Sequence, residues 1–248
     1  MKKILLAIIL VLALVSIACQ STPLAAKVQV KDTKTDPELI KNATLLIVVE
    51  NIQKTEVTLA YDMATLVKVQ NEIFLVTHNH WGDMLKDMNI IELRDADNKM
   101  LRPMYASEFK SLIVYQDAGT RVLRAPEWLV DSLTPASLER STQLKPGDTV
   151  QVAYHSQPNR DQVEIQDAVV EEINVYKDAP VYTLRSLNGQ SLQPGDSGGG
   201  VWHNGTLVAN IWTVTTKYSV VDAAGTVDPA SETLTDRSNA AIFPESFK

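Results

Sequence analysis

Ser197 lies in a cluster of glycines, directly after an aspartate, within the run Pro194-Gly195-Asp196-Ser197-Gly198-Gly199-Gly200. A serine hydroxyl becomes an effective nucleophile only when a base removes its proton and nearby donors hold the oxyanion that forms. Glycines let the backbone turn sharply and leave room for a substrate carbonyl to approach main-chain N–H groups. The segment is therefore typical of a nucleophile with its oxyanion hole, although an ordinary glycine-rich turn could also contain a serine.

The base must come from one of four histidines, which are His78, His80, His155 and His203. The apolar run 74–77 ends at His78 and predicts a strand that presents an imidazole at its end. His78 and His80 are two residues apart, so both would point to one face of an extended strand. Two imidazoles on one face would also suit zinc, but the sequence offers no clear third ligand, and we expect no metal. We expect His155 at the surface and His203 at the edge of a hairpin.

Together with the segment around Ser197, the run Val76-Thr77-His78-Asn79-His80-Trp81 resembles the chymotrypsin-like (trypsin-fold) serine peptidases. That family carries Gly-Asp-Ser-Gly-Gly around its nucleophile and Thr-Ala-Ala-His-Cys around its base. The threonine and the final histidine match, whereas the two alanines and the cysteine are replaced by His78, Asn79 and Trp81. The resemblance extends over roughly residues 40 to 245, and its register implies that His80 is the base.

The resemblance also implies the remaining members of the site. The backbone N–H groups of Gly195 and Ser197 would form the oxyanion hole, and Asp196 would support the loop. The family order of His, Asp and Ser along the chain places the orienting acid between His80 and Ser197, and Asp117 is favoured because it follows an apolar run and precedes a hydrophobic strand. The substrate pocket would be formed by Ser191, Gln193, Trp212, Thr213 and Val214. Since no acid stands at Ser191, we expect a small or medium apolar side chain to be preferred over Lys or Arg, and no cofactor.

The N-terminus has the pattern of a bacterial lipoprotein signal. Lys2 and Lys3 precede the apolar run 4–18, which is short for a membrane span. Cys19 follows Ala18 in a segment that resembles a lipobox, so we expect a signal peptide over 1–18 and acylation of Cys19. Two or more acyl chains give stable anchoring, which predicts an extracytoplasmic protein held to a bacterial membrane. An ordinary signal peptide cleaved nearby is the alternative.

Composition restricts the class of protein further. Cys19 is the single cysteine, so the fold cannot rely on internal disulfides. The chain has 23 basic and 30 acidic residues and a net charge of −7. An acidic chain is a poor candidate for nucleic-acid binding, which needs lysine and arginine to neutralise phosphates.

The pattern along the chain predicts an all-β fold. Short β-branched runs separated by turn residues are expected at 45–49, 57–61, 63–69, 72–77, 88–94 and 112–115 in the first half, and at 144–154, 163–173, 181–187, 200–203, 207–214 and 217–222 in the second. Residues 19–42 are predicted to be a tether, with a short helix near 37–40, and 126–140 a partly helical linker. The resemblance implies two six-stranded antiparallel β-barrels, at 43–140 and 141–248, with the active site between them.

The resulting hypothesis is a serine endopeptidase that hydrolyses peptide bonds through Ser197, His80 and Asp117. One alternative is a non-catalytic module of the same fold that binds peptides or proteins at the membrane surface. Another is a structural or ligand-binding lipoprotein in which the glycine loop is only a turn. The hypotheses differ in whether residues 80, 117 and 197 converge.

Overall fold

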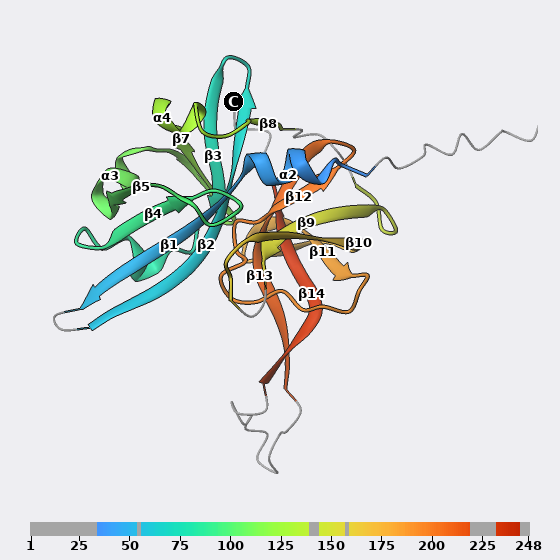
Figure 1. The fold of residues 1–248 in the computed structure, drawn as a ribbon. Helices are drawn as coiled ribbons and strands as arrows, with labels where there is room; N and C mark the ends of the chain where they lie inside the picture. Colours follow the sequence, from blue (N-terminus) through green and yellow to red (C-terminus); the bar gives the residue numbers. More distant parts are fainter. Residues whose placement is uncertain (1–33, 54–55, 139–143, 157–158, 219–231, 244–248) are drawn as a thin grey trace, which may run out of the picture. The chain divides into compact units, whose positions relative to one another are not determined.

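The computed structural model describes residues 34–53, 56–138, 144–156, 159–218 and 232–243. The predicted signal peptide, Cys19 and most of the predicted tether lie outside these residues. The described part consists of two mainly antiparallel β-sheets with a few short helices (Figure 1). The all-β prediction is confirmed. Among the described helices, none combines the length and the apolar character needed to cross a membrane.

The N-terminal sheet has eight strands in the described residues. They are β1 (Thr44–Gln53), β2 (Glu56–Val69), β3 (Glu72–His78), β4 (Ile90–Arg94), β5 (Met100–Tyr105), β6 (Ile113–Gln116), β7 (Thr120–Arg124) and β8 (Ala136–Ser137). Their order is β5-β4-β1-β2-β3-β7-β6, and β8 pairs with β2 in parallel. This differs from the expected closed barrel of six strands. Strands β5 and β8 were not indicated by the sequence pattern, whereas β7 is the hydrophobic strand expected after Asp117.

The C-terminal sheet is the expected closed barrel of six strands, in the order β10-β11-β14-β13-β12-β9. Its strands are β9 (Thr149–His155), β10 (Val163–Tyr176), β11 (Ala179–Ser186), β12 (Gly200–His203), β13 (Thr206–Tyr218) and β14 (Glu232–Ile242). Of the strand predicted at 217–222, residues 217 and 218 are the end of β13 and the rest lie outside the described residues, whereas β14 was not indicated by the sequence pattern. The site depends on this barrel because β12 follows the glycine loop that carries Ser197.

Short helices connect these strands. They are α2 (Pro37–Ala43), the 3-10 helix η1 (Gly82–Leu85), α3 (Ala106–Ser111) and α4 (Glu127–Val130). The predicted helix near 37–40 is thus confirmed, and α4 lies within residues 126–140, where a partly helical linker was predicted. Helix α2 begins where the Asp36 carboxylate accepts a hydrogen bond from the Glu38 N–H, and Pro37 stands in its first turn.

Some strands escaped the sequence pattern for physical reasons. Strand β5 contains Pro103 and mostly exposed or half-buried side chains, and it lies at the edge of its sheet, where proline is tolerated. Strand β2 is continuous through Asp62, where the sequence predicted a break between two strands. A charged residue inside an apolar run usually marks a turn, but the Asp62 side chain is buried with a partner of its own.

Strand β1 is apolar at successive positions because both of its faces are buried. Leu45, Ile47 and Val49 pack inside the N-terminal sheet. Leu46 belongs to a second cluster that includes Ala153 and Trp202 of the C-terminal barrel. The two sheets therefore share a continuous apolar interface, and segments that end at this interface can be brought together.

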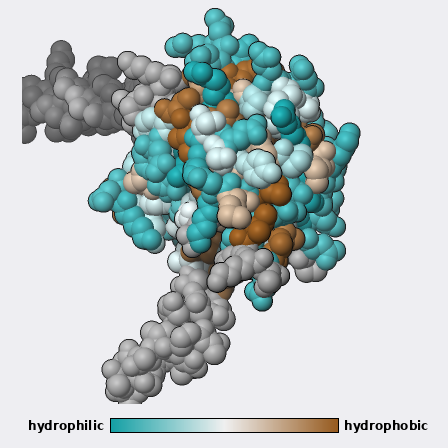
Figure 2. Space-filling view, turned by 90° about the vertical axis from the view of Figure 1, so that its left-hand side faces the viewer, coloured by the Kyte–Doolittle hydropathy of each residue, from teal (hydrophilic) through white to brown (hydrophobic). Residues whose placement is uncertain are grey.

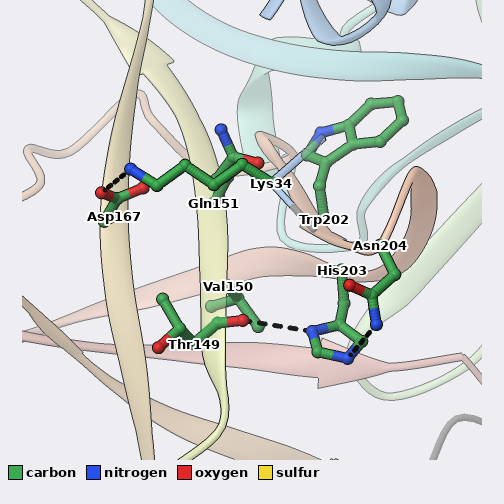
Figure 3. A pocket seen from close by; sticks show the side chains of 8 residues that line it. All are labelled: Lys34, Thr149, Val150, Gln151, Asp167, Trp202, His203 and Asn204. Carbon is green, nitrogen blue, oxygen red and sulfur yellow. Dashed lines mark hydrogen bonds and ion pairs between the residues drawn. The ribbon is translucent and has the colours of Figure 1, made fainter. Parts of the chain in front are cut away.

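The last residues of the predicted tether are part of the fold. The Thr35 N–H donates to the Gln151 side-chain oxygen, and its hydroxyl accepts from the Gly205 N–H. Lys34 pairs with Asp167 on β10, at the edge of a cavity of about 210 Å³ (Figure 3). Thr35 is 1% exposed, so ordered structure begins before Ala43, where the sequence placed its start.

The surface carries scattered apolar side chains. Val57, Leu59, Met88, Tyr105 and Val175 are among the large ones that are exposed. On the face in Figure 2, hydrophobic residues lie in separate patches between hydrophilic ones. Isolated exposed apolar residues are normal in folded proteins and indicate no particular partner.

Candidate active site

The structure brings His80 to Ser197. His80 lies just after β3, and Ser197 lies in the turn before β12. The distance from His80 Nε2 to Ser197 Oγ is 3.1 Å, within hydrogen-bond reach. Ser197 is 9% exposed, whereas His80 is open to solvent along part of its surface. This arrangement suits a nucleophile and a base. It brings together a residue that follows a strand of the N-terminal sheet and a residue that precedes a strand of the C-terminal barrel.

Backbone contacts with both sheets hold the turn that carries the nucleophile. The Met63 N–H on β2 donates to the Ser197 carbonyl at 2.9 Å, and the Gly198 N–H donates to the Ile211 carbonyl on β13 at 2.7 Å. Gly198 has φ +85°, and a Cβ there would lie 1.9 Å from the Met63 carbonyl oxygen. Glycine is therefore required at Gly198 both by its backbone conformation and by the close approach of β2.

Asp196 supports the same turn from inside the barrel. Its side chain is fully buried and accepts from the Gln193 N–H at 2.6 Å and from the His155 N–H at 3.0 Å. The His155 Nδ1 lies 3.2 Å from the same carboxylate. The prediction that His155 is a surface residue is wrong, because its ring is fully buried against Asp196 at the end of β9. A buried histidine thus supports the loop from within the folded barrel.

His203 lies where the sequence expected it, next to the turn between β12 and β13. Its Nδ1 is 3.1 Å from the Thr149 carbonyl oxygen, and its Nε2 is 2.9 Å from the Asn204 amide (Figure 3). These contacts give His203 a structural role at the hairpin, apart from the described contacts of Ser197.

The two predicted oxyanion donors are available. Within the described residues, neither the Gly195 N–H nor the Ser197 N–H donates a hydrogen bond. Gly195 has φ +103° and is crowded by the Tyr61 carbonyl and by Arg160, whose guanidinium would lie 2.2 Å from an added Cβ. A side chain at Gly195 would therefore displace the arginine and fill the space in front of the nucleophile.

Asp117 has a different set of contacts from the one that the sequence predicted. Its Oδ1 accepts from the N–H groups of Gly119 and Thr120, at 2.9 and 2.7 Å, and its Oδ2 accepts from the Tyr115 hydroxyl at 3.1 Å. The hydrogen bonds of the described residues do not join this carboxylate to His80. The intervening turn of Ala118 and Gly119 gives Asp117 backbone donors of its own, so the structure shows it closing the β6–β7 turn.

A buried pair that the sequence did not indicate lies next to the base. His78 Nε2 is 2.7 Å from Asp62 Oδ1, and both side chains are almost fully buried. The His80 backbone N–H donates to His78 Nδ1 at 3.2 Å. Nδ1 must therefore be the acceptor, which leaves the His78 proton on Nε2, pointing at Asp62. The separation of two residues between His78 and His80 indicated that both rings lie on one face, but nothing in the sequence marked Asp62 as the partner of His78.

The rings around His78 form a stack. His78 lies 3.9 Å from His80 between ring centroids and 5.1 Å from Trp81, with which it is nearly parallel. The Trp81 indole N–H donates to the His78 carbonyl at 2.9 Å. Trp81 is 1% exposed and packs on Phe109, so the stack is rooted in the N-terminal core.

Burial shifts the pKa values of this cluster in opposite directions. Desolvation and, to a smaller extent, the positive charge of Arg121 lower the pKa of His78 to about 3. Desolvation raises the pKa of Asp62 to about 8, against the opposing effect of His80. The pKa of His80 is lowered first by desolvation and then by His78. His78 is thus neutral at pH 7, in agreement with its hydrogen bonds, and His80 is in the form that can accept a proton.

A cleft of about 510 Å³ opens beside the nucleophile. It is lined by Leu59, Ala60, Tyr61, Asp62, His80, Met84, Arg160, Pro194, Gly195 and Ser197. Arg160 stacks over the Tyr61 ring at 5.3 Å. Within the described residues, no carboxylate forms an ion pair with Arg160, so the cleft has a cation that could meet an anionic group.

The five predicted pocket residues do not line this cleft. The Trp212 carbonyl lies 3.4 Å from Ser197 Oγ, which places β13 beside the nucleophile, but the indole is buried against Tyr176. Thr213 accepts from Asn239 on β14, and the Gln193 N–H donates to Asp196. Ser191 is half-buried, as is Val214, which packs on the core of the barrel. Their role in substrate recognition stays a prediction. Among the described residues, no group of three or more His, Cys, Asp or Glu is placed to hold a metal ion.

Comparison with known proteins finds no matching family model and no matching curated protein. Among solved structures, the chain is similar to the HtrA-type protease AlgW with a tripeptide, at 13% identity and a TM-score of 0.52 over 82% of this chain. A serine-to-alanine variant of that protease, also with a tripeptide, matches at 14% identity and a TM-score of 0.51. The chain spans 57% of the length of either structure. The described part of this chain therefore has the trypsin-like fold found in HtrA-type serine proteases.

Proposed function

We propose that the chain is a serine endopeptidase in which Ser197 is the nucleophile and His80 the base. The observation that carries this proposal is the 3.1 Å contact between His80 Nε2 and Ser197 Oγ. Three further features support it: the unused N–H groups of Gly195 and Ser197, the open cleft in front of them and a fold shared with proteases.

In the proposed reaction, Ser197 Oγ attacks the carbonyl carbon of the scissile peptide while its proton passes to His80 Nε2. The carbonyl π electrons move to the oxygen, where the N–H groups of Gly195 and Ser197 stabilise the negative charge. Collapse of this intermediate breaks the C–N bond, and the proton on His80 leaves with the amine. Water, deprotonated by His80, then hydrolyses the acyl-enzyme and restores the Ser197 hydroxyl.

The test is cleavage of a diverse peptide library by the purified chain, with Ser197→Ala and His80→Ala as matched controls. We expect cleavage by the wild type and at least 10³-fold less by each variant, since removal of either group disables the same step. Cleavage that persists in Ser197→Ala would contradict the proposal, and so would a folded wild type that cleaves no peptide.

We also propose that the protein acts outside the cytoplasm, held to a membrane by acylated Cys19. The support is the charged and apolar pattern of residues 1–18 and the small residue before Cys19. Mass spectrometry of the protein from a bacterial membrane fraction, compared with Cys19→Ser, tests this part. Acyl groups on Cys19 are expected, and an unmodified protein released into the medium would contradict it.

The alternative is a non-catalytic module that binds peptides in the same cleft. Its specific support is that the hydrogen bonds of the described residues leave the Asp117 carboxylate on its own turn and away from His80. The library experiment separates the two functions, because a binding module would retain peptides without cleaving them.

A further inference from the structure

The proposed base requires a group that fixes its orientation. A histidine that can turn freely spends little time with Nε2 directed at the nucleophile, and misplacement by about 1 Å can cost 10²-fold in rate. The sequence predicts that Asp117 has this role, but its carboxylate is engaged by Gly119, Thr120 and Tyr115. Within the described residues, the hydrogen bonds of His80 are the one to Ser197 and the one from its backbone to His78.

The contacts of His78 can fix His80 in two ways. The His78 ring lies against the His80 ring, with centroids 3.9 Å apart, and so limits its rotation. His78 Nδ1 also accepts the His80 backbone N–H, which fixes the chain at the point where it leaves β3. The ring contact requires that His78 is itself immobile. The hydrogen bond also requires that its Nδ1 carries no proton.

Asp62 meets both requirements. Its Oδ1 accepts from His78 Nε2 at 2.7 Å, which holds the proton on Nε2 and leaves Nδ1 as an acceptor. On the other side of His78, Trp81 is stacked at 5.1 Å and donates to the His78 carbonyl. The exposed fraction of His78 is 0%, so the ring cannot move without opening the core.

Asp62 also connects the pair to the nucleophile. It directly precedes Met63, whose N–H donates to the Ser197 carbonyl, and it lines the cleft with His80 and Ser197. Its second oxygen, Oδ2, is buried and has no hydrogen-bond partner among the described residues. A carboxyl held in this way costs stability, which is expected of a group retained for the site.

We propose that Asp62 and His78 are positioning residues that orient His80 in place of an aspartate bonded to the base itself. The inference rests on the proposed peptidase function and assigns a role within that same site. It predicts that the hydrogen-bonding nitrogens of His78 matter to the chemical step and that the bulk of its ring does not suffice.

The test variant is His78→Phe, which keeps a ring between His80 and Trp81 but removes both nitrogens. We expect kcat for peptide cleavage to fall about 10²-fold, with KM within threefold of the wild type. Phe109→Leu serves as the matched control, because Phe109 packs on Trp81 in the same core, and the ring contacts of the described residues do not join it to His78 or His80. It should lower stability while keeping kcat. A kcat for His78→Phe within threefold of the wild type would overturn the proposal.

Asp117→Asn decides between the two candidates for orientation. A loss of about 10⁴, the effect expected when an orienting aspartate is replaced, would assign the role to Asp117 and overturn the proposal. A loss below tenfold supports it, since an asparagine oxygen can still accept from Gly119 and Thr120.

A measurement without turnover keeps the inference separable from the proposed function. Nitrogen-15 NMR of the wild-type side chains reports which ring nitrogen carries the proton. We expect His78 protonated on Nε2 and unprotonated on Nδ1 from pH 5 to pH 8. The opposite tautomer would overturn the positioning role of Asp62 and His78, even if the enzyme is active or if His78→Phe fails to fold. An inactive wild type with the expected tautomer would contradict only the peptidase function.

Discussion

Replacement of Asp196 by asparagine tests how the nucleophile turn is held. The carboxylate is fully buried, with one oxygen accepting from the Gln193 N–H and the other from both donors of His155. Asparagine keeps a single acceptor. If its oxygen faces His155, its amide N–H groups face the Gln193 N–H, and two donors meet at a site closed to water.

The magnitude follows from these contacts. Leaving a buried donor unsatisfied costs about 1–3 kcal/mol, and a hydrogen bond to a charged group contributes about 1.5–3 kcal/mol. We therefore expect Asp196→Asn to lower the free energy of unfolding by about 2–4 kcal/mol. Gly195 and Ser197 flank Asp196, so displacement of the turn also moves the N–H groups that we propose as oxyanion donors. Loss of one such donor typically costs about 10²–10³ in rate.

Urea unfolding measures the first effect, and the rate of peptide cleavage measures the second. Asp97→Asn is the matched control, because Asp97 is exposed in the β4–β5 turn, and it should change neither quantity. If Asp196→Asn unfolds within 0.5 kcal/mol of the wild type, a difference typical of neutral surface changes, the argument that Asp196 holds the turn is refuted.

Three further predictions concern the glycine loop, pH and the cleft. Gly198→Ala should abolish cleavage and lower the melting temperature, because its Cβ would overlap the Met63 carbonyl oxygen at a backbone φ of +85°; a folded, active variant would contradict this. The free energy of unfolding should be greatest near pH 6.5. Below this pH, His78 and His80 take up protons in the unfolded chain but not in the native state, which lowers stability by more than the proton held by native Asp62 raises it. Above it, native Asp62 stays protonated until about pH 8 while the unfolded carboxyl is ionised, so stability falls as the pH rises. Unfolding free energies measured at pH 4.5, 6.5 and 8 that rise or fall throughout would exclude this. Finally, Arg160→Gln should reduce kcat/KM about two- to fivefold for peptides with an acidic residue near the scissile bond, and an equal loss for neutral peptides would argue against a charge contact.

The sequence predicted the elements of the site that are encoded locally. Glycines and a serine in one run mark a turn that can carry a nucleophile, and an apolar run that ends in histidine marks a strand end. These two signals left both His78 and His80 as candidates for the base, and the resemblance to trypsin-fold peptidases favoured His80. The strand pattern predicted an all-β fold, and the resemblance implied the closed C-terminal barrel.

The partners that the sequence missed are defined by tertiary contacts. Asp62 interrupts an apolar run, so local pattern assigned it to a turn, whereas the structure buries it against His78. His155 ends a strand and gave no sign of the buried carboxylate that it meets. Asp117 is a case in which the sequence suggested a contact that the described residues do not show. Its position along the chain is compatible with an orienting acid, but the N–H groups of Gly119 and Thr120 in the following turn donate to its carboxylate.

The proposed function requires that Ser197 reacts as a nucleophile activated by His80. Intact-protein mass spectrometry after treatment with a fluorophosphonate tests it most directly, since this reagent forms a stable adduct with an activated serine. We expect one adduct on Ser197 in the wild type, none in Ser197→Ala and much slower labelling in His80→Ala. A folded wild-type protein that takes no label, or one labelled at another residue, would contradict it.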